Sequence, residues 1–263
     1  AQFPAQRRCG GSVGMTGLLA TVAASHPTRS SHAHVVGTLG RQIVDGTFPP
    51  GSILPGDKDL GETFGVSRTV LREAMKTLAA KRLIEAKTRV GTRVLERERW
   101  NLLDQDVLRW RVEAGLDGRF IEDLATMRLA FEPEAAALAC RRAASADIAR
   151  LEAIVAELGN PAHDRTSIAR VDLKFHLAVA DISQNPFMRA TSGLIETALA
   201  IVLRLSSPAE DAEMIRECAD NHRLIVEAIA SGDEERARAT MRTVIELGAT
   251  RTQAALGDGA AEG

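Results

Sequence analysis

The first regular pattern in the chain is a helical one. Between His34 and Asp45 the apolar residues fall every three or four positions, which is the spacing of a helix that buries one face. Gly46 and the turn formers at 49–51 stop this pattern. The sequence therefore predicts a helix over 34–45, with its apolar side chains directed inward.

A helical period also runs from about Arg119 to Arg251. It is interrupted at five places that are rich in Gly, Pro, Ser or Asn: near 145 and at 159–161, 185–186, 206–208 and 231–233. These breaks predict a bundle of six or seven helices. No stretch of this region alternates apolar and polar residues well enough to predict a strand.

The segment from 51 to 95 has a different order of elements. An apolar-periodic helix is followed by a tight turn at Gly65–Ser67, a second helix and two short strands, 83–86 and 92–95. A basic turn at 87–91 joins the strands. This is the order of a winged helix-turn-helix, whose second helix enters the major groove of DNA.

The second helix of this segment has a basic face and an apolar face. Arg68 and Arg72 lie four residues apart, so both project from its first turns on one side. Leu71 and Leu78 fall on the opposite stripe, which predicts a buried face. Ser67 is placed to cap the helix. Arginines in this position can bridge guanine O6 and N7 or bind phosphate.

The predicted fold class is therefore mainly α. An N-terminal winged helix-turn-helix of three helices and a small β-hairpin wing precedes an all-helical bundle. The expected divisions are a disordered tail over 1–33, the DNA-binding domain over 34–98, a connector over 99–118, a ligand-sensing domain over 119–251 and a disordered tail over 252–263. The connector carries two tryptophans and several leucines, which predicts a docked, partly helical segment.

Charge divides the chain in the same place. Residues 34–99 hold 12 basic and 8 acidic residues, a net charge of +4, whereas 100–263 hold 18 and 27, a net charge of −9. A basic segment ahead of an acidic one is typical of a DNA-binding domain joined to a self-associating sensor. The small positive charge favours a homodimer that binds two half-sites of double-stranded DNA.

Cysteine content and hydropathy indicate the cellular compartment of the protein. The three cysteines form neither a metal-binding spacing nor an even disulfide framework, which favours the reducing cytoplasm. No run approaches the roughly 18 apolar residues of a membrane span. The sequence predicts a cytoplasmic protein with no membrane partner.

A few polar residues interrupt the apolar stripes of the predicted bundle. Arg128 falls on a stripe with Ile121, Leu124, Phe131, Ala135 and Leu138. Asp172 and His176 are four apart on one helix face, and His222 lies on a third stripe. Because buried charged groups are costly unless paired, three helices that each direct one inward indicate a shared polar pocket. Each residue alone could instead be an ordinary core residue, and Arg128 could simply pair with a nearby glutamate.

The DNA-binding segment resembles the GntR family of bacterial transcription regulators. The matching residues are Leu54-Pro55, 66–69, 71–74 and Gly91-Thr92. The DNA-contacting positions that this resemblance implies are Lys58, Arg68, Thr69, Arg72 and Gly91. Lys58 stands where the family has arginine, so it keeps the charge but loses the bidentate fork, and a phosphate contact is expected there.

The helical part resembles the FCD ligand-sensing domain of the FadR subfamily. The matching residues are Arg128 with Glu132-Pro133, 172–176, Asn185-Pro186 and Asn221-His222. The resemblance implies that Asp172, His176 and His222 ligate a divalent metal, zinc or nickel, and that Arg128 meets the carboxylate of an effector. The family's fourth ligand position is occupied by Val244. Three ligands with an open position can still hold zinc.

The resulting hypothesis is a repressor of sugar-acid catabolism genes that an aldonate such as galactonate releases from its operator. The effector-binding residues would be Arg128, Asp172, His176 and His222. Two alternatives stay open from the residues alone. One is a metal-dependent hydrolase fused to a DNA-binding module, since Asp and two His with an open position could activate water. The other is a DNA-binding protein without a ligand, whose polar pocket is merely a satisfied core.

Overall fold

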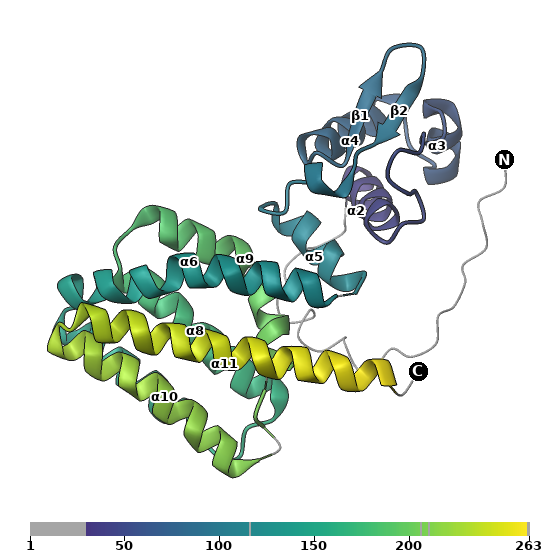
Figure 1. Cartoon of the computed structure of the whole chain (residues 1–263). Helices are drawn as coiled ribbons and strands as arrows, with labels where there is room; N and C mark the ends of the chain where they lie inside the picture. Colours follow the sequence, from purple (N-terminus) through teal and green to yellow (C-terminus); the bar gives the residue numbers. More distant parts are fainter. Residues whose placement is uncertain (1–29, 116, 206, 210, 262–263) are drawn as a thin grey trace.

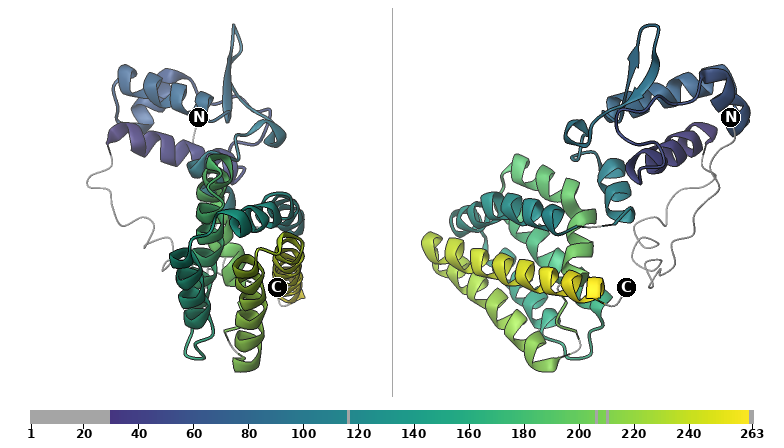
Figure 2. Two further views of the ribbon diagram at one scale, coloured as in Figure 1. Left: turned by 90° about the vertical axis from the view of Figure 1, so that its left-hand side faces the viewer. Right: turned by 45° about the vertical axis from the view of Figure 1, so that its right-hand side comes forward.

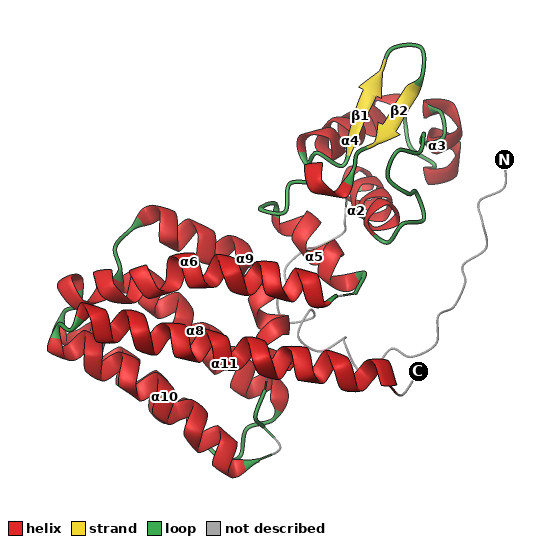
Figure 3. Cartoon of the chain, in the orientation of Figure 1, coloured by secondary structure: helices red, strands yellow, loops and turns green. Residues whose placement is uncertain are grey.

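The computed structural model describes residues 30–115, 117–205, 207–209 and 211–261. This part of the chain contains ten α-helices, one two-stranded sheet and one short 3-10 helix, Arg97–Arg99. A small N-terminal head sits beside a larger helical bundle (Figures 1 and 2), and Figure 3 shows that only the head contains strands. The predicted fold class is confirmed.

The head contains the expected winged helix-turn-helix. Its helices are α2 (Ser31–Val44), α3 (Asp57–Phe64) and α4 (Arg68–Ala80), and its wing is the antiparallel pair β1 (Ile84–Lys87) and β2 (Gly91–Val94). The strands begin and end one residue from the predicted bounds, toward the tip of the hairpin. The flanking apolar residues Leu83 and Leu95, which suggested strand positions, lie in the core of the head.

The turn between α3 and α4 depends on two residues. Gly65 adopts the left-handed conformation, with φ 61° and ψ 34°, that ends α3. Ser67 then caps α4, its side-chain oxygen accepting a hydrogen bond from the backbone N–H of Val70 at 3.3 Å. Leu71 and Leu78 are fully buried, so α4 turns its apolar face into the head and its other face to solvent.

Helix α5 (Gln105–Glu113) lies between head and bundle and belongs to both cores (Figure 1). Val107 and Trp110 pack in the core of the head. Leu108 and Val112, on another side of the same short helix, pack against α6, α8 and α9 of the bundle. The connector thus joins the two parts through a buried helix.

Lys81 fastens α5 to the end of α4. It is the C-cap residue of α4, and its Nζ lies 2.7 and 2.9 Å from the two carboxylate oxygens of Asp104. Asp104 is the N-cap residue of α5, and Asp106 adds a third contact with Lys81 at 2.9 Å. The Lys81 ammonium also lies 5.8 Å from the ring centre of Trp110. With a side chain only 11% exposed, Lys81 joins the two helices by a partly buried ion-pair network.

The bundle consists of six helices in the described residues. They are α6 (Gly118–Arg142), α7 (Ser145–Leu158), α8 (Arg165–Ile182), α9 (Pro186–Leu205), α10 (Ala212–Ser231) and α11 (Glu234–Ala261). Helix α11 runs along α6 and α10, and α8 packs against α6, α7 and α9. None of the described helices combines the length and the hydropathy needed to cross a membrane.

The bounds predicted for the two tails, 1–33 and 252–263, differ from the observed ends of the helices. Helix α2 starts at Ser31 because the Ser30 side chain accepts from the N–H of Ala33 and His32 contacts Thr77 at 3.1 Å; the rest of the predicted tail, 1–29, lies outside the described residues. Helix α11 continues to Ala261, so a disordered tail from 252 is wrong. Thr252 is fully buried there and Gln253 donates to Glu122 at 3.2 Å. Residues 262–263 lie outside the described part.

The contact between α2 and α5 yields a stability prediction. A Cβ added at Gly40 would lie 2.2 Å from Cζ3 of Trp110, so Gly40→Ala has to displace α5. We expect overpacking to lower the free energy of unfolding by about 1–3 kcal/mol. Gly37→Ala on the same helix is the control, because its Cβ would approach only Arg41, at 3.5 Å. There we expect a gain of about 1 kcal/mol from helix propensity.

Urea unfolding followed by tryptophan fluorescence reports on the head, because Trp100 and Trp110 are the chain's two tryptophans and both pack in its core. Equal stabilisation by the two substitutions would contradict the close packing of Trp110 on Gly40.

Candidate ligand and DNA-binding sites

The predicted DNA-contacting residues are all exposed on the head. They are Lys58, Arg68, Thr69, Arg72 and Gly91. Arg68 is the first residue of α4 and Arg72 follows one turn later. Within the described part of the chain neither guanidinium has an ion-pair or hydrogen-bond partner. Both are therefore free to contact DNA in the orientation that the helix-turn-helix requires.

Two of these residues also have local structural explanations. Lys58, in the first turn of α3, is 4.0 Å from Glu62 in an exposed pair that contributes little. Gly91 has φ 114°, which only glycine adopts readily, and a Cβ there would lie 3.2 Å from Ile53. Gly91 is thus required by the backbone of the wing, whatever it contacts.

The four polar residues predicted for the pocket meet inside the bundle. Arg128 comes from α6, Asp172 and His176 from α8, and His222 from α10. Nε2 of His176 lies 3.2 Å from Oδ1 of Asp172, and Nε2 of His222 lies 3.1 Å from the same oxygen. Nη2 of Arg128 is 3.3 Å from Nε2 of His176. One buried cluster therefore contains all four.

Glu132 is a fifth member that the apolar pattern did not identify. Its Oε1 accepts a hydrogen bond from Nε of Arg128 at 2.6 Å, and its Oε2 accepts from Nη2 at 3.3 Å. The prediction placed Phe131 on the inward stripe, but Phe131 is 42% exposed and Glu132 is buried instead. The signal was available in the spacing, since a residue four positions after Arg128 shares its helix face. Its charge argued against burial.

The two imidazoles present the same nitrogen to Asp172. Nδ1 of His222 lies 2.7 Å from the carbonyl oxygen of Cys218, which only accepts, so this nitrogen carries the proton. Nδ1 of His176 lies 2.6 Å from Oε2 of Glu132, at an angle unsuited to a good hydrogen bond. Two unprotonated acceptors repel at that distance, so we place the proton on Nδ1 here too. Both Nε2 atoms then face the carboxylate.

This donor set fits a metal ion on three sides. Ligand atoms of Asp172, His176 and His222 all lie within 4.8 Å of one another. Bonds of about 2.0–2.1 Å to tetrahedral zinc place neighbouring donors about 3.3 Å apart. Oδ1 of Asp172 lies 3.2 and 3.1 Å from the Nε2 atoms of His176 and His222, which is close to that separation. Arg128 partly opposes the fit, since it contacts the same Nε2 of His176. A bound cation would require that contact to lengthen.

Charge pairing stabilises the ionised forms in the cluster. Burial lowers the pKa of His222, but the Asp172 carboxylate outweighs it and raises that pKa to about 10. The pKa of His176 is raised against burial by Glu132 and Asp172. Burial raises the pKa of Glu132, yet Arg128 and His176 bring it down to about 2. Without a metal, the raised pKa values favour protonated imidazoles, so His176, His222 and Arg128 surround the two carboxylates with positive charge.

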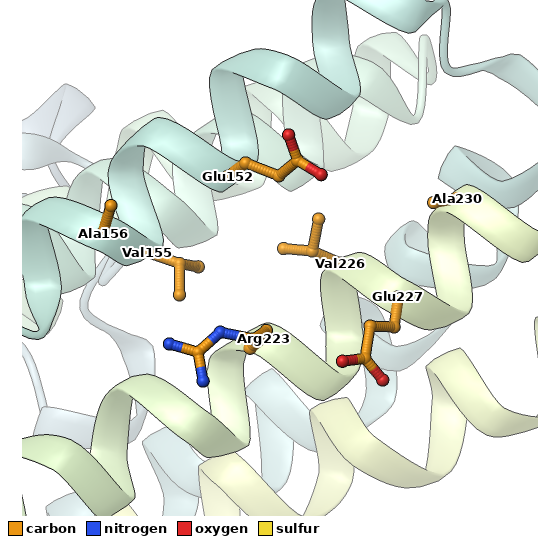
Figure 4. Close-up of a pocket in the computed structure, with 7 residues that line it drawn as sticks. All are labelled: Glu152, Val155, Ala156, Arg223, Val226, Glu227 and Ala230. Atoms are coloured by element: carbon orange, nitrogen blue, oxygen red, sulfur yellow. The ribbon is translucent and has the colours of Figure 1, made fainter.

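Arg128 lines a small cavity whose other lining residues are apolar. This cavity measures about 10 Å³, no more than the room for one water. A larger pocket of about 330 Å³ lies between α7 and α10 (Figure 4), where Glu152 and Val155 lie across from Arg223 and Glu227. No residue of the polar cluster lines this pocket, so the pocket is separate from the cluster.

Comparison with known proteins decides the family. The model of bacterial regulatory proteins of the gntR family matches residues 32–94. The galactonate operon transcriptional repressor of Escherichia coli is 36% identical over 211 residues, covering 80% of this chain and 92% of that protein. The chain belongs to the GntR family of transcriptional regulators. The FCD domain model matches residues 123–247, which include the whole polar cluster.

Other relatives agree with this assignment. The uncharacterized regulator YieP of Escherichia coli is 35% identical, over 76% of this chain and 85% of YieP. LutR of Bacillus subtilis is 29% identical, over 76% of this chain and 90% of LutR. These domains and relatives are transcriptional regulators rather than enzymes.

The fold has a solved counterpart. The structure of Lar, which controls the expression of the agr system of Listeria monocytogenes, matches with a TM-score of 0.58 and 18% identity, covering 87% of this chain and 99% of Lar. At this identity the likeness concerns the fold alone.

Val244 permits a test of the three-donor arrangement. It is 7% exposed and belongs to the same apolar core as Phe175, the neighbour of His176. We expect Val244→His to raise the affinity for Zn²⁺ by roughly an order of magnitude or more, because a fourth imidazole completes a tetrahedral set. Competition with a chromophoric chelator measures the affinity.

The control for this test is Val244→Phe, which alters packing without adding a donor. Zinc binding that is equal in the wild type, Val244→His and Val244→Phe would show that position 244 does not face the donor set.

Proposed function

We propose that this regulator represses genes of sugar-acid catabolism and leaves its operator when an aldonate such as galactonate binds. The observation that carries the proposal is the buried Arg128–Asp172–His176–His222 cluster inside a matched FCD domain. The similarity to the galactonate operon repressor supports the effector class. We place the protein in the cytoplasm as a homodimer, so that two heads can bind two half-sites of operator DNA.

Each pocket residue has a proposed role. Arg128 would bind the carboxylate of the effector, because a guanidinium offers paired N–H donors in the geometry of a carboxylate. Asp172, His176 and His222 would hold a divalent cation, zinc or nickel. When bound, the cation supplies a Lewis-acidic position for an oxygen of the effector. Cation and Arg128 together carry enough positive charge to accept an anion beside two internal carboxylates.

Helix α5 supports a route from the pocket to the DNA. Leu108 and Val112 of α5 share a core with Leu124 of α6 and Leu173 of α8, next to the pocket residues. The opposite face of α5 is fastened to α4 through Lys81. A shift of α6 or α8 on effector binding would therefore move α5 and the recognition helix α4 with it. Such a shift needs an effector that favours one arrangement over the other.

A second candidate is a DNA-binding regulator that responds to no ligand. Two observations favour it: Arg128 already has an internal carboxylate partner in Glu132, and the adjoining cavity holds about 10 Å³. The polar cluster would then be a satisfied core. The response to aldonates separates the two candidates.

The recognition helix gives a prediction for DNA binding. Arg72→Ala should abolish specific operator binding, because a bidentate guanine contact contributes roughly 1–3 kcal/mol of discrimination and a dimer makes two. Lys76→Ala is a matched control, since Lys76 lies one turn later on α4 and is paired with Glu73 at 2.8 Å. Gel-shift titration of the operator fragment measures both. Equal losses would show general charge effects instead of base recognition.

Effector binding can be tested with the full chain. We expect D-galactonate to raise the melting temperature and to release operator DNA, since a ligand at a hundred times its Kd stabilises the folded state by about 2.7 kcal/mol. Both effects should fail in Arg128→Lys, which keeps the charge but loses the fork. Arg141→Lys is the control, an exposed arginine of α6 paired with Glu234.

The outcomes of this experiment differ for each hypothesis. A wild-type protein that binds its operator but ignores a panel of aldonates would refute the effector class. No thermal shift with any small carboxylate would favour the ligand-independent regulator.

A further inference from the structure

Glu132 touches two functional residues with its two carboxylate oxygens. Oε1 accepts from Nε of Arg128 at 2.6 Å. Oε2 lies 2.6 Å from Nδ1 of His176 and 3.3 Å from Nη2 of Arg128. The side chain of Glu132 is only 11% exposed, so water does little to weaken these contacts. One carboxylate thus lies between the proposed anion-binding residue and a proposed metal ligand.

On each partner Glu132 occupies the end that the proposed function does not use. It takes the side edge of the guanidinium, formed by Nε and Nη2, and leaves Nη1 without a partner in the described structure. On the imidazole it takes Nδ1, so that Nε2 points to Asp172. The ends that Glu132 leaves uncovered are the ones that would bind a carboxylate or a cation, although Nε2 of His176 also contacts Asp172 and Nη2 of Arg128.

We propose that Glu132 is a positioning residue that orients Arg128 toward the effector and sets the tautomer of His176 that binds the metal. This inference rests on the proposed function of the pocket. A carboxylate that contacts the far nitrogen of a metal-binding histidine fixes the ring and makes it a better donor. By joining Arg128 to the same carboxylate, the chain holds both binding groups in one mutual geometry.

A simpler account treats Arg128 and Glu132 as a stabilising pair four residues apart on α6. That pair alone would not need the contact with His176, which comes from α8. The simpler account predicts that loss of Glu132 lowers stability but leaves the tautomer of His176 and the zinc affinity unchanged. These two quantities therefore separate positioning from stability.

The substitution Glu132→Gln distinguishes a positioning role from a purely stabilising one. Arg128 only donates, so the amide oxygen should stay on its Nε, at the shortest contact. The amide NH₂ then faces Nδ1 of His176, where it can donate only to an unprotonated nitrogen. The imidazole proton must move to Nε2, the atom that has to be free to bind a metal. The substitution keeps the volume of the side chain while reversing the tautomer.

Zinc alone is the probe, so no effector needs to be known. We expect Glu132→Gln to weaken Zn²⁺ binding by about 10–100-fold, the usual effect of losing such a partner. The second readout is two-dimensional ¹H–¹⁵N NMR of the imidazoles, recorded at a pH above their raised pKa values so that both rings are neutral. The His176 proton should lie on Nδ1 in the wild type and on Nε2 in the variant. Circular dichroism confirms that each protein is folded.

Glu134→Gln is the matched control. Glu134 lies two residues further along α6 and also pairs with an arginine, Arg238, at 2.7 Å, but its side chain is 50% exposed. Its loss should change neither zinc affinity nor the His176 tautomer. An equal change in both variants would point to a general effect of charge on α6 and would overturn the role of Glu132.

The remaining outcomes separate this inference from the proposed metal site. Normal zinc affinity and an unchanged tautomer in Glu132→Gln overturn the inference while the metal site stands. If the wild type binds no zinc, the metal site fails, and the tautomer in the two proteins still decides the role of Glu132. If the variant does not fold, zinc-loaded wild type decides: coordination through Nδ1 of His176 would overturn the proposal.

Discussion

The helical bundle depends on the pairing of charged side chains that it has removed from water. Arg128, Glu132 and His176 are each less than a tenth exposed, and His222 is almost completely buried. An isolated ion in such surroundings would cost many kcal/mol, so the cluster persists only because each charge faces an opposite one. The shifts in pKa follow from this arrangement. They also explain why three helices must meet in one register, since a displaced helix would leave a buried charge unpaired.

The same requirement gives the pocket its capacity to respond. A network in which each charge is paired with an internal partner can be rearranged by a cation, an anion or both. The cavity that Arg128 lines measures only about 10 Å³, so a ligand that enters there has to move helices apart or replace an internal contact. Helix α5 lies where such a movement of the helices would displace it. Its two faces contribute to different cores, and Lys81 ties it to the end of the recognition helix.

Pattern and spacing were sufficient for much of the head. The left-handed Gly65, the capping Ser67 and the exposed Arg68 and Arg72 follow from local rules of turns, caps and helix faces. The predicted bounds of the two wing strands differ from the observed ones by one residue. The reason is that the apolar residues beside a strand can pack in the core of the head without belonging to the strand. The helical ends were less predictable. Ser31–Ala33 and 252–261 lack a clear apolar period and are helical through caps and contacts with distant residues such as Thr77 and Glu122.

By itself the sequence determined the mainly helical class, the DNA-binding head and the inward direction of Arg128, Asp172, His176 and His222, since each depends on spacing within one element. Only the tertiary structure decided which of these residues touch and through which atoms. It buried Glu132 in place of Phe131, turned both Nε2 atoms toward one oxygen of Asp172 and made α5 a member of two cores. The physical reason is that burial of a charge becomes favourable only with partners from other helices. Such partners are neighbours in space but lie up to 50 residues away in the sequence, where no periodicity can reveal them.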